Sequence, residues 1–214
     1  GGTGVISAAD TGAPLTGGTV TLYSSTGAIG AEATIGKTGA YAFRNVPRGT
    51  YAVLIRPAGE AYAPTWSDGA SSSADADYFS MSTSSLKKNF SVLRAGSITG
   101  KATSTQQWGL TLELWQFSGG TWTWIDSSWS QSGTAFTFAG LAPGVYAVTA
   151  FSEGRGDPEA APRIDVGAGA TVDVGTVTNV PVTAGILRGT VAGIRAASDV
   201  RVVATAADGK SYSA

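Results

Sequence analysis

The sequence contains no cysteine and no histidine among its 214 residues. Without them the chain has no disulfide, no thiol nucleophile, no imidazole base and no zinc site of the usual ligand set. Only carboxylate, lysine or tyrosine chemistry remains, and the acidic residues are thinly spread. We therefore expect a protein that is not an enzyme and that holds no metal and no cofactor.

Charge is also scarce in this chain. Charged residues make up 14% of it, and 14 Lys and Arg against 15 Asp and Glu give a net charge of −1. Because no basic stripe is present, we expect no nucleic-acid partner. No apolar run approaches the ~20 residues that span a bilayer, and the first residues lack the regions of a signal peptide. We expect a soluble, mature or excised segment.

Alternation of apolar and polar residues is the pattern that the sequence does have. Short alternating segments are separated by Gly, Pro, Asn and Ser, and no segment has a convincing helical period. A period of two predicts strands, so the fold class is all-β. The clearest predicted strands are residues 19–23, 40–46, 50–55, 110–117, 134–141 and 145–151.

The sequence also repeats itself. Residues 39–53, GAYAFRNVPRGTYAV, match residues 134–148, TAFTFAGLAPGVYAV, at the aromatic, turn and tyrosine positions. The opening strands align as well, at Gly4, Gly100 and Gly189. Units of this size with frequent turns suit β-sandwiches. We predict repeat 1 at 1–94, repeat 2 at 95–184 and the start of an incomplete third repeat at 185–214.

The repeated motif carries structural predictions of its own. Tyr41 and Phe43 alternate toward one side, residues 47–49 make a turn, and the chain returns from Tyr51, which predicts a hairpin. Tyr51 and Tyr146 are predicted to hold equivalent buried positions, with each hydroxyl bound to a backbone partner.

At these residues the chain resembles the carboxypeptidase regulatory-like domains of bacterial secreted proteins, relatives of transthyretin-like and collagen-adhesin B-type sandwiches. The resemblance rests on GVI at 4–6, on TGAPLTGGTVTLY at 11–23 and on the motif at 39–53. It implies tandem immunoglobulin-like (prealbumin-like) β-sandwich domains. It further implies stalks, spacers or adhesive modules at the bacterial cell surface or attached to secreted enzymes.

Some collagen-adhesin relatives contain a Lys–Asn isopeptide bond promoted by a buried acid. Lys101 and Asn179 are the candidate pair in repeat 2, but Lys101 shares the polar side of its strand with Thr99. The acid expected after the motif tyrosine is replaced by Ile55 and Ala150. We therefore expect Lys101 to be an ordinary exposed lysine.

Five of the six tryptophans lie between residues 108 and 129. A tight turn at residues 119–120 pairs Phe117 with Trp122 and Trp115 with Trp124, which forms an aromatic ladder on one face. Such a ladder can pack under a neighbouring domain or subunit, stabilise the hairpin, or stack on sugar rings. These four residues are the candidate binding site.

The same register makes two further predictions. Ile125 lies opposite Leu114, facing the core with Leu112, and Glu113 lies opposite Asp126. Two carboxylates can serve a glycosidase, but like charges directly opposite are unfavourable, which favours a solvated strand end.

A second candidate site is Arg155-Gly156-Asp157, which follows a strand ending near Phe151 and precedes Pro158. An integrin-type adhesive role requires such a tripeptide in an exposed turn. The alternative is an ordinary loop, because loops favour Gly and Asp.

Our leading interpretation is a non-enzymatic extracellular structural or adhesive repeat protein that forms a stalk, spacer or fibre on the bacterial surface. Its expected partner is another protein or an adjacent subunit, and a glycan is possible. The alternative is a carbohydrate-binding appendage of a secreted glycoside hydrolase. The strands expected at 185–193 and 199–206 have apolar faces and unpaired edges. We expect these to be covered either by residues beyond 214 or by strands of an adjacent subunit.

Overall fold

The computed structural model describes residues 1–82, 86–104, 109–151, 156–179, 203–205 and 211–213. The chain forms two compact units, Gly1–Pro181 and Val182–Ala214. Regular structure in the described residues is β-strand apart from one short 3-10 helix, η1 (Ser67–Gly69), which confirms the all-β fold class. Among these residues no helix has the length and apolar character needed to cross a membrane.

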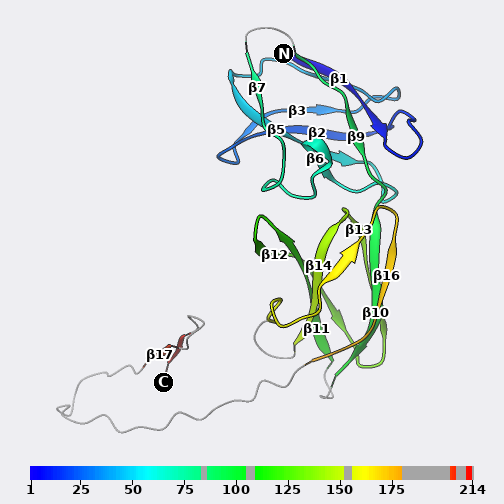
Figure 1. The fold of residues 1–214 in the computed structure, drawn as a ribbon, viewed down its shortest axis with the longest axis vertical. Coiled ribbons are helices and arrows are strands. Elements are labelled where there is room, and N and C mark those ends of the chain that lie inside the picture. The colour runs from blue at the N-terminus through cyan, green and yellow to red at the C-terminus, as the bar shows by residue number, and fades with distance from the viewer. Residues whose placement is uncertain (83–85, 105–108, 152–155, 180–202, 206–210, 214) are drawn as a thin grey trace, which may run out of the picture. The chain divides into compact units, whose positions relative to one another are not determined.

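The strands between Gly2 and Val92 form the first sandwich (Figure 1). One layer contains β1 (Gly2–Ala8), β4 (Ala40–Phe43), β8 (Leu86–Lys87) and β9 (Phe90–Val92). The other contains β2 (Gly18–Ser24), β3 (Ile29–Thr34), β5 (Gly49–Pro57), β6 (Thr65–Trp66) and β7 (Phe79–Met81). Its core includes Ile6, Leu22 and Ile55, which are fully buried because alternate residues of each strand face inward.

The strands between Gly96 and Thr178 form the second sandwich (Figure 1). One sheet has the order β13 (Ala135–Leu141), β10 (Gly96–Thr103), β16 (Thr171–Thr178). The other has the order β12 (Thr121–Ser130), β11 (Leu110–Ser118), β14 (Gly144–Phe151), β15 (Ile164–Val166). Ile98, Leu112 and Leu114 lie in its core, and β12 is an edge strand. β9 ends at Val92 and β10 begins at Gly96, and the domain boundary after residue 94 stays a prediction.

In the second unit, β17 (Val203–Thr205) pairs antiparallel with β18 (Ser211–Ser213). The strand predicted at 199–206 contains β17. The strand predicted at 185–193 lies outside the described residues.

The repeated motif is a corner between two sheets, so the predicted hairpin is wrong. In the first sandwich β4 pairs with β1 whereas β5 pairs with β2, and in the second β13 pairs with β10 whereas β14 pairs with β11. The alternation of residues determines which side chains are buried, but it does not determine which strand lies alongside.

The motif tyrosines hold these corners together, as predicted. Tyr51 is 5% exposed and Tyr146 is 2% exposed. The Tyr51 hydroxyl donates to the carbonyl oxygen of Pro47 at 3.2 Å, and that of Tyr146 donates to the carbonyl oxygen of Ala142 at 2.7 Å. Each bond spans the turn between the two sheets, as in the tyrosine corners of other sandwiches.

A glycine faces an aromatic ring at the start of each sandwich. Gly4 on β1 lies opposite Tyr41, and Gly100 on β10 lies opposite Phe136. A β-carbon at Gly4 would overlap the carbonyl oxygen of Lys88 and would lie 2.8 Å from the Tyr41 ring. At Gly100 it would lie 2.7 Å from the Phe136 ring. The repeated glycine is therefore required by close packing of the ring over the backbone.

Buried tyrosines predict a loss of stability in alkali. Burial raises the pKa of Tyr41 and of Tyr146 to about 12, from an ordinary value of 10.0. These tyrosines lose their protons at a lower pH in the unfolded chain than in the folded chain, so their ionisation favours unfolding. Their contribution to the free energy of unfolding is therefore complete below pH ~10 and is lost as the pH rises toward about 12. We expect the melting temperature, followed by circular dichroism, to fall across this window. The melting temperature of the variant Tyr41→Phe/Tyr146→Phe should fall less steeply with pH. The same slope in the variant and the parent chain would contradict the assignment of this pH dependence to the two tyrosines.

Candidate binding surface

The aromatic ladder forms on the hairpin of β11 and β12, in the predicted pairing. Trp115 lies opposite Trp124 and Phe117 lies opposite Trp122, with ring centroids of the latter pair 5.1 Å apart. The turn uses Gly119 and Gly120, whose φ angles are 57° and 79°. Positive φ at both positions is what a tight hairpin turn needs, and glycine adopts it without strain.

Beyond Trp124 the register shifts at a β-bulge. Leu114 lies opposite Asp126, so Ile125 is the extra residue, and Glu113 lies opposite Ser127. The predicted pairs Leu114–Ile125 and Glu113–Asp126 are therefore wrong. Ile125 is 40% exposed rather than part of the core. Counting residues from the turn gives the wrong partners once a strand contains an extra residue.

The bulge brings a further tryptophan to the ladder. Trp129 lies opposite Thr111, and directly opposite residues point to the same face of a sheet. Thr111 alternates with Glu113 and Trp115, so Trp129 shares their face. In an unbroken strand Trp129 would face the other way, which is why sequence reasoning misses it. Its only signal is its place in the tryptophan cluster.

The chain covers one part of this face itself. Glu113 is only 3% exposed, and its Oε2 accepts a hydrogen bond from the Gly156 backbone N–H at 3.4 Å. Beside it the Trp115 indole N–H donates to Thr149 Oγ1 at 3.0 Å. A β-carbon at Gly156 would overlap the Thr149 side chain. The connection between β14 and β15 therefore lies on the sheet at Gly156.

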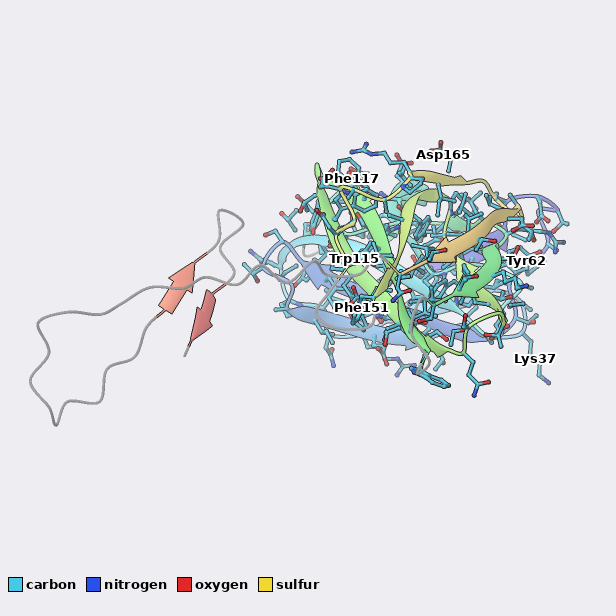
Figure 2. The ribbon with its side chains drawn as sticks, turned by 90° about the horizontal axis from the view of Figure 1, so that it is seen from below. Lys37, Tyr62, Trp115, Phe117, Phe151 and Asp165 are labelled. Atoms are coloured by element: carbon cyan, nitrogen blue, oxygen red, sulfur yellow. The ribbon has the colours of Figure 1, made fainter. Side chains whose placement is uncertain are left out.

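The same connection places a cation on the ladder. The Arg163 guanidinium carbon lies 4.3 Å from the Phe117 ring centroid and 5.6 Å from that of Trp122. Figure 2 labels Trp115 and Phe117 on β11, Phe151 on β14 and Asp165 on β15. Trp115, Phe117 and Trp122 are half-buried. In contrast Trp124 is 43% exposed and Trp129 is 62% exposed.

The predicted adhesive tripeptide lies partly within the described residues. Arg155 is outside them, Gly156 is half-buried against Thr149, and Asp157 is exposed. Asp157 Oδ1 accepts a hydrogen bond from the backbone N–H of Glu159 at 3.0 Å. The adhesive role of this tripeptide stays a prediction. Gly156 of this tripeptide packs closely against the sheet.

The candidate isopeptide pair and the acidic side chains are the two remaining groups for which the sequence makes a chemical prediction. Lys101 is exposed whereas Asn179 is 1% exposed, as expected for an ordinary surface lysine. In the described part of the chain no cluster of acidic side chains is suited to a metal ion.

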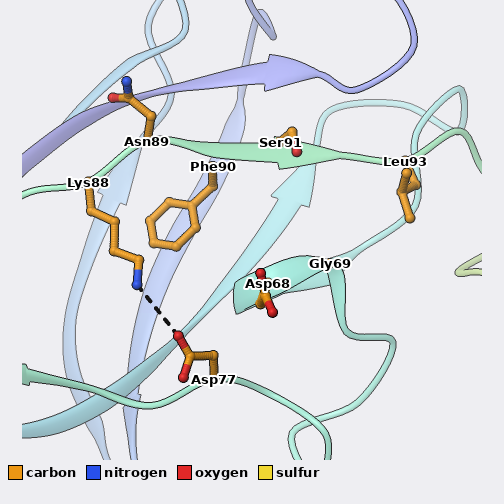
Figure 3. Close-up of a pocket in the computed structure, with 8 residues that line it drawn as sticks. All are labelled: Asp68, Gly69, Asp77, Lys88, Asn89, Phe90, Ser91 and Leu93. Carbon is orange, nitrogen blue, oxygen red and sulfur yellow. Dashed lines mark ion pairs between the residues drawn. The ribbon is translucent and has the colours of Figure 1, made fainter.

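A polar hollow of about 430 Å³ lies in the first sandwich (Figure 3). Lys88 Nζ pairs there with Asp77 Oδ2 at 3.8 Å and lies 4.4 Å from the Phe79 ring centroid. Its lining also includes Asp68, Asn89, Phe90 and Ser91. Because the lysine and the aspartate satisfy each other, we assign this hollow no ligand.

Comparison with known proteins gives structural likeness only. No protein-family model matches the chain, and no curated protein matches its sequence. The resemblance to carboxypeptidase regulatory-like domains therefore stays a prediction.

Several solved structures are similar. The minor pilin of Streptococcus agalactiae is 16% identical with a TM-score of 0.45, over 87% of this chain and 99% of that one. A streptococcal ancillary pilin is 15% identical with a TM-score of 0.43, over 84% and 62%. The Bacillus anthracis TIE protein is 13% identical with a TM-score of 0.34, over 83% and 34%. This chain thus spans about a third of the last protein and less than two thirds of the ancillary pilin, and TM-scores this low establish no shared function.

Proposed function

We propose that this chain is a non-enzymatic extracellular structural protein, a spacer or fibre component, that contacts an adjacent copy of itself through β12. The contact surface consists of Trp124, Ile125 and Trp129. Assembly at the bacterial surface and an adhesive role belong to the same proposal.

Exposure of large apolar side chains on one edge strand is the observation that carries the proposal. Trp124, Ile125 and Trp129 are 43%, 40% and 62% exposed. Several charges, proline or bulges commonly protect an edge strand, and β12 has only one charged residue, Asp126, one bulge and no proline among its 10 residues. Tryptophans are the residues that most often anchor protein interfaces.

A polypeptide partner fits this surface better than a sugar does. In the part of the chain that the structure describes β12 is the last strand of its sheet, so its outer side can pair with a strand of another chain. Ile125 adds an aliphatic side chain, whereas sugar rings stack on flat aromatic faces. A second copy is a favourable partner because the chain has a net charge of only −1, so copies repel one another weakly.

We expect the full chain to self-associate with rising concentration in sedimentation velocity. The variant Trp124→Ser/Trp129→Ser should weaken that association at least ~30-fold, because a buried interface tryptophan contributes about 2 kcal/mol or more. Ile29→Ser is the matched control, since Ile29 is 63% exposed on β3 of the first sandwich. That variant should associate like the parent chain.

A monomeric parent chain at every concentration would contradict the proposal. A parent chain that instead binds a polysaccharide panel, with binding lost in Trp124→Ser/Trp129→Ser, would favour the carbohydrate-binding appendage. The two exposed tryptophans are the observation that keeps this alternative open.

A further inference from the structure

The segment that joins the two sandwiches, residues 93–95, is paired with the first sandwich through its backbone. The Ala63 N–H donates to the Leu93 carbonyl oxygen at 2.9 Å, and the Ala95 N–H donates to the Ala61 carbonyl oxygen at 3.1 Å. Tyr62 and Arg94 thus form an isolated antiparallel bridge. The join begins as an additional paired strand rather than as a free linker.

The side chain of Arg94 adds a second connection to the first sandwich. Its Nε donates to Asp10 Oδ2 at 2.5 Å, and its guanidinium carbon lies 5.3 Å from the Tyr62 ring centroid. The Tyr62 hydroxyl donates to the other oxygen of Asp10 at 3.4 Å. The Arg94 hydrogen bond lowers the pKa of the Asp10 carboxyl, which favours the charged carboxylate that Arg94 pairs with. Arg94, Asp10 and Tyr62 form one connected group.

The same segment is bonded to the second sandwich. The Gly169 N–H donates to the Arg94 carbonyl oxygen at 3.1 Å, and directly after the segment the Ser97 N–H of β10 donates to the Ala170 carbonyl oxygen at 2.8 Å. Gly96 fits closely here, because a β-carbon on it would overlap Val166 Cγ1. Arg94 therefore bonds to the first sandwich by its side chain and to the second by its carbonyl group.

We propose that the join is a fixed connection, with Arg94 as the residue that fixes it, so that the two sandwiches move as one body. Independent motion is the ordinary expectation for domains connected by a linker. An exposed ion pair alone contributes little. Here the pair acts together with the Tyr62 ring and with three backbone hydrogen bonds that residues 93–95 make to the two sandwiches. Such a connection gives a spacer a defined direction.

The sequence itself suggests a substitution that tests the role of Arg94. LRAG at residues 93–96 aligns with VTAG at residues 182–185, so Thr183 stands where the first join has Arg94. Arg94→Thr therefore removes the side-chain connection without introducing a residue foreign to such a segment. Arg56→Thr is the matched control, because Arg56 is an exposed arginine on β5.

Residual dipolar couplings of the full chain measure whether the two sandwiches share one alignment tensor. The parent chain and Arg56→Thr should need a single tensor for residues 1–179. In Arg94→Thr the common tensor should be lost, while chemical shifts of both cores stay unchanged. Two independent tensors in the parent chain would overturn the proposal. An Arg94→Thr variant that keeps the common tensor would overturn the assignment to Arg94. Neither result depends on the tryptophans of β12.

Discussion

Replacing Tyr146 with alanine is expected to lower the free energy of unfolding by about 3–5 kcal/mol, the range for large aromatic truncations in cores. The ring is 2% exposed, and its hydroxyl donates to Ala142 and accepts a bond from Gln116 Nε2 at 3.3 Å. The substitution removes the packing of the ring and both hydrogen bonds. Urea unfolding followed by circular dichroism measures the change.

Tyr146→Phe separates the ring from the hydroxyl. It keeps the packing and removes both hydrogen bonds of the hydroxyl, to Ala142 and from Gln116, so we expect a cost of only about 1–2 kcal/mol. Tyr51→Ala should behave like Tyr146→Ala, because Tyr51 makes the equivalent bond to Pro47. Unchanged unfolding in both alanine variants would show that the repeat alignment does not mark equivalent structural positions.

Replacing Gly4 with alanine is expected to destabilise the first sandwich by about 3 kcal/mol or more, at the upper end for overpacked cores. The new methyl group would overlap the Lys88 carbonyl oxygen, which is backbone and cannot rotate away. β1 would then have to separate from β8 and β9 or from the Tyr41 ring. Thermal unfolding of the full chain gives the size of the loss.

Gly36→Ala is the matched control for this prediction. A β-carbon there meets only the Ala40 carbonyl oxygen at 3.4 Å, an ordinary contact, and Gly36 is exposed. We expect its effect to stay within about 0.5 kcal/mol. A Gly4→Ala variant as stable as Gly36→Ala would refute the argument from close packing.

The sequence predicts the parts of this fold that depend on local pattern. Alternation identifies core residues such as Tyr41 and Phe43, and the repeat by itself identifies Tyr51 and Tyr146 as equivalent. Alternation says nothing of the partner strand, because a residue that faces inward does so in either sheet of a sandwich. The Gly39–Val53 motif therefore predicts a hairpin, whereas in the folded chain it connects two sheets.

The candidate site is predicted near its turn and not beyond it. The turn at Gly119 and Gly120 determines the pairing as far as Trp115 and Trp124. Beyond them, no residue type in the sequence indicates the bulge at Ile125. The cover over Glu113 depends on Gly156, which is distant in sequence and adjacent only after folding. Contacts of this kind leave no periodic signal.

Amide hydrogen exchange of the full chain in a dilution series tests the self-association through β12 most directly. At high concentration the account predicts slower exchange in β12 (Thr121–Ser130), with unchanged exchange in β3 (Ile29–Thr34), an edge strand of the first sandwich. Exchange in β12 that is equally fast at every concentration would contradict it.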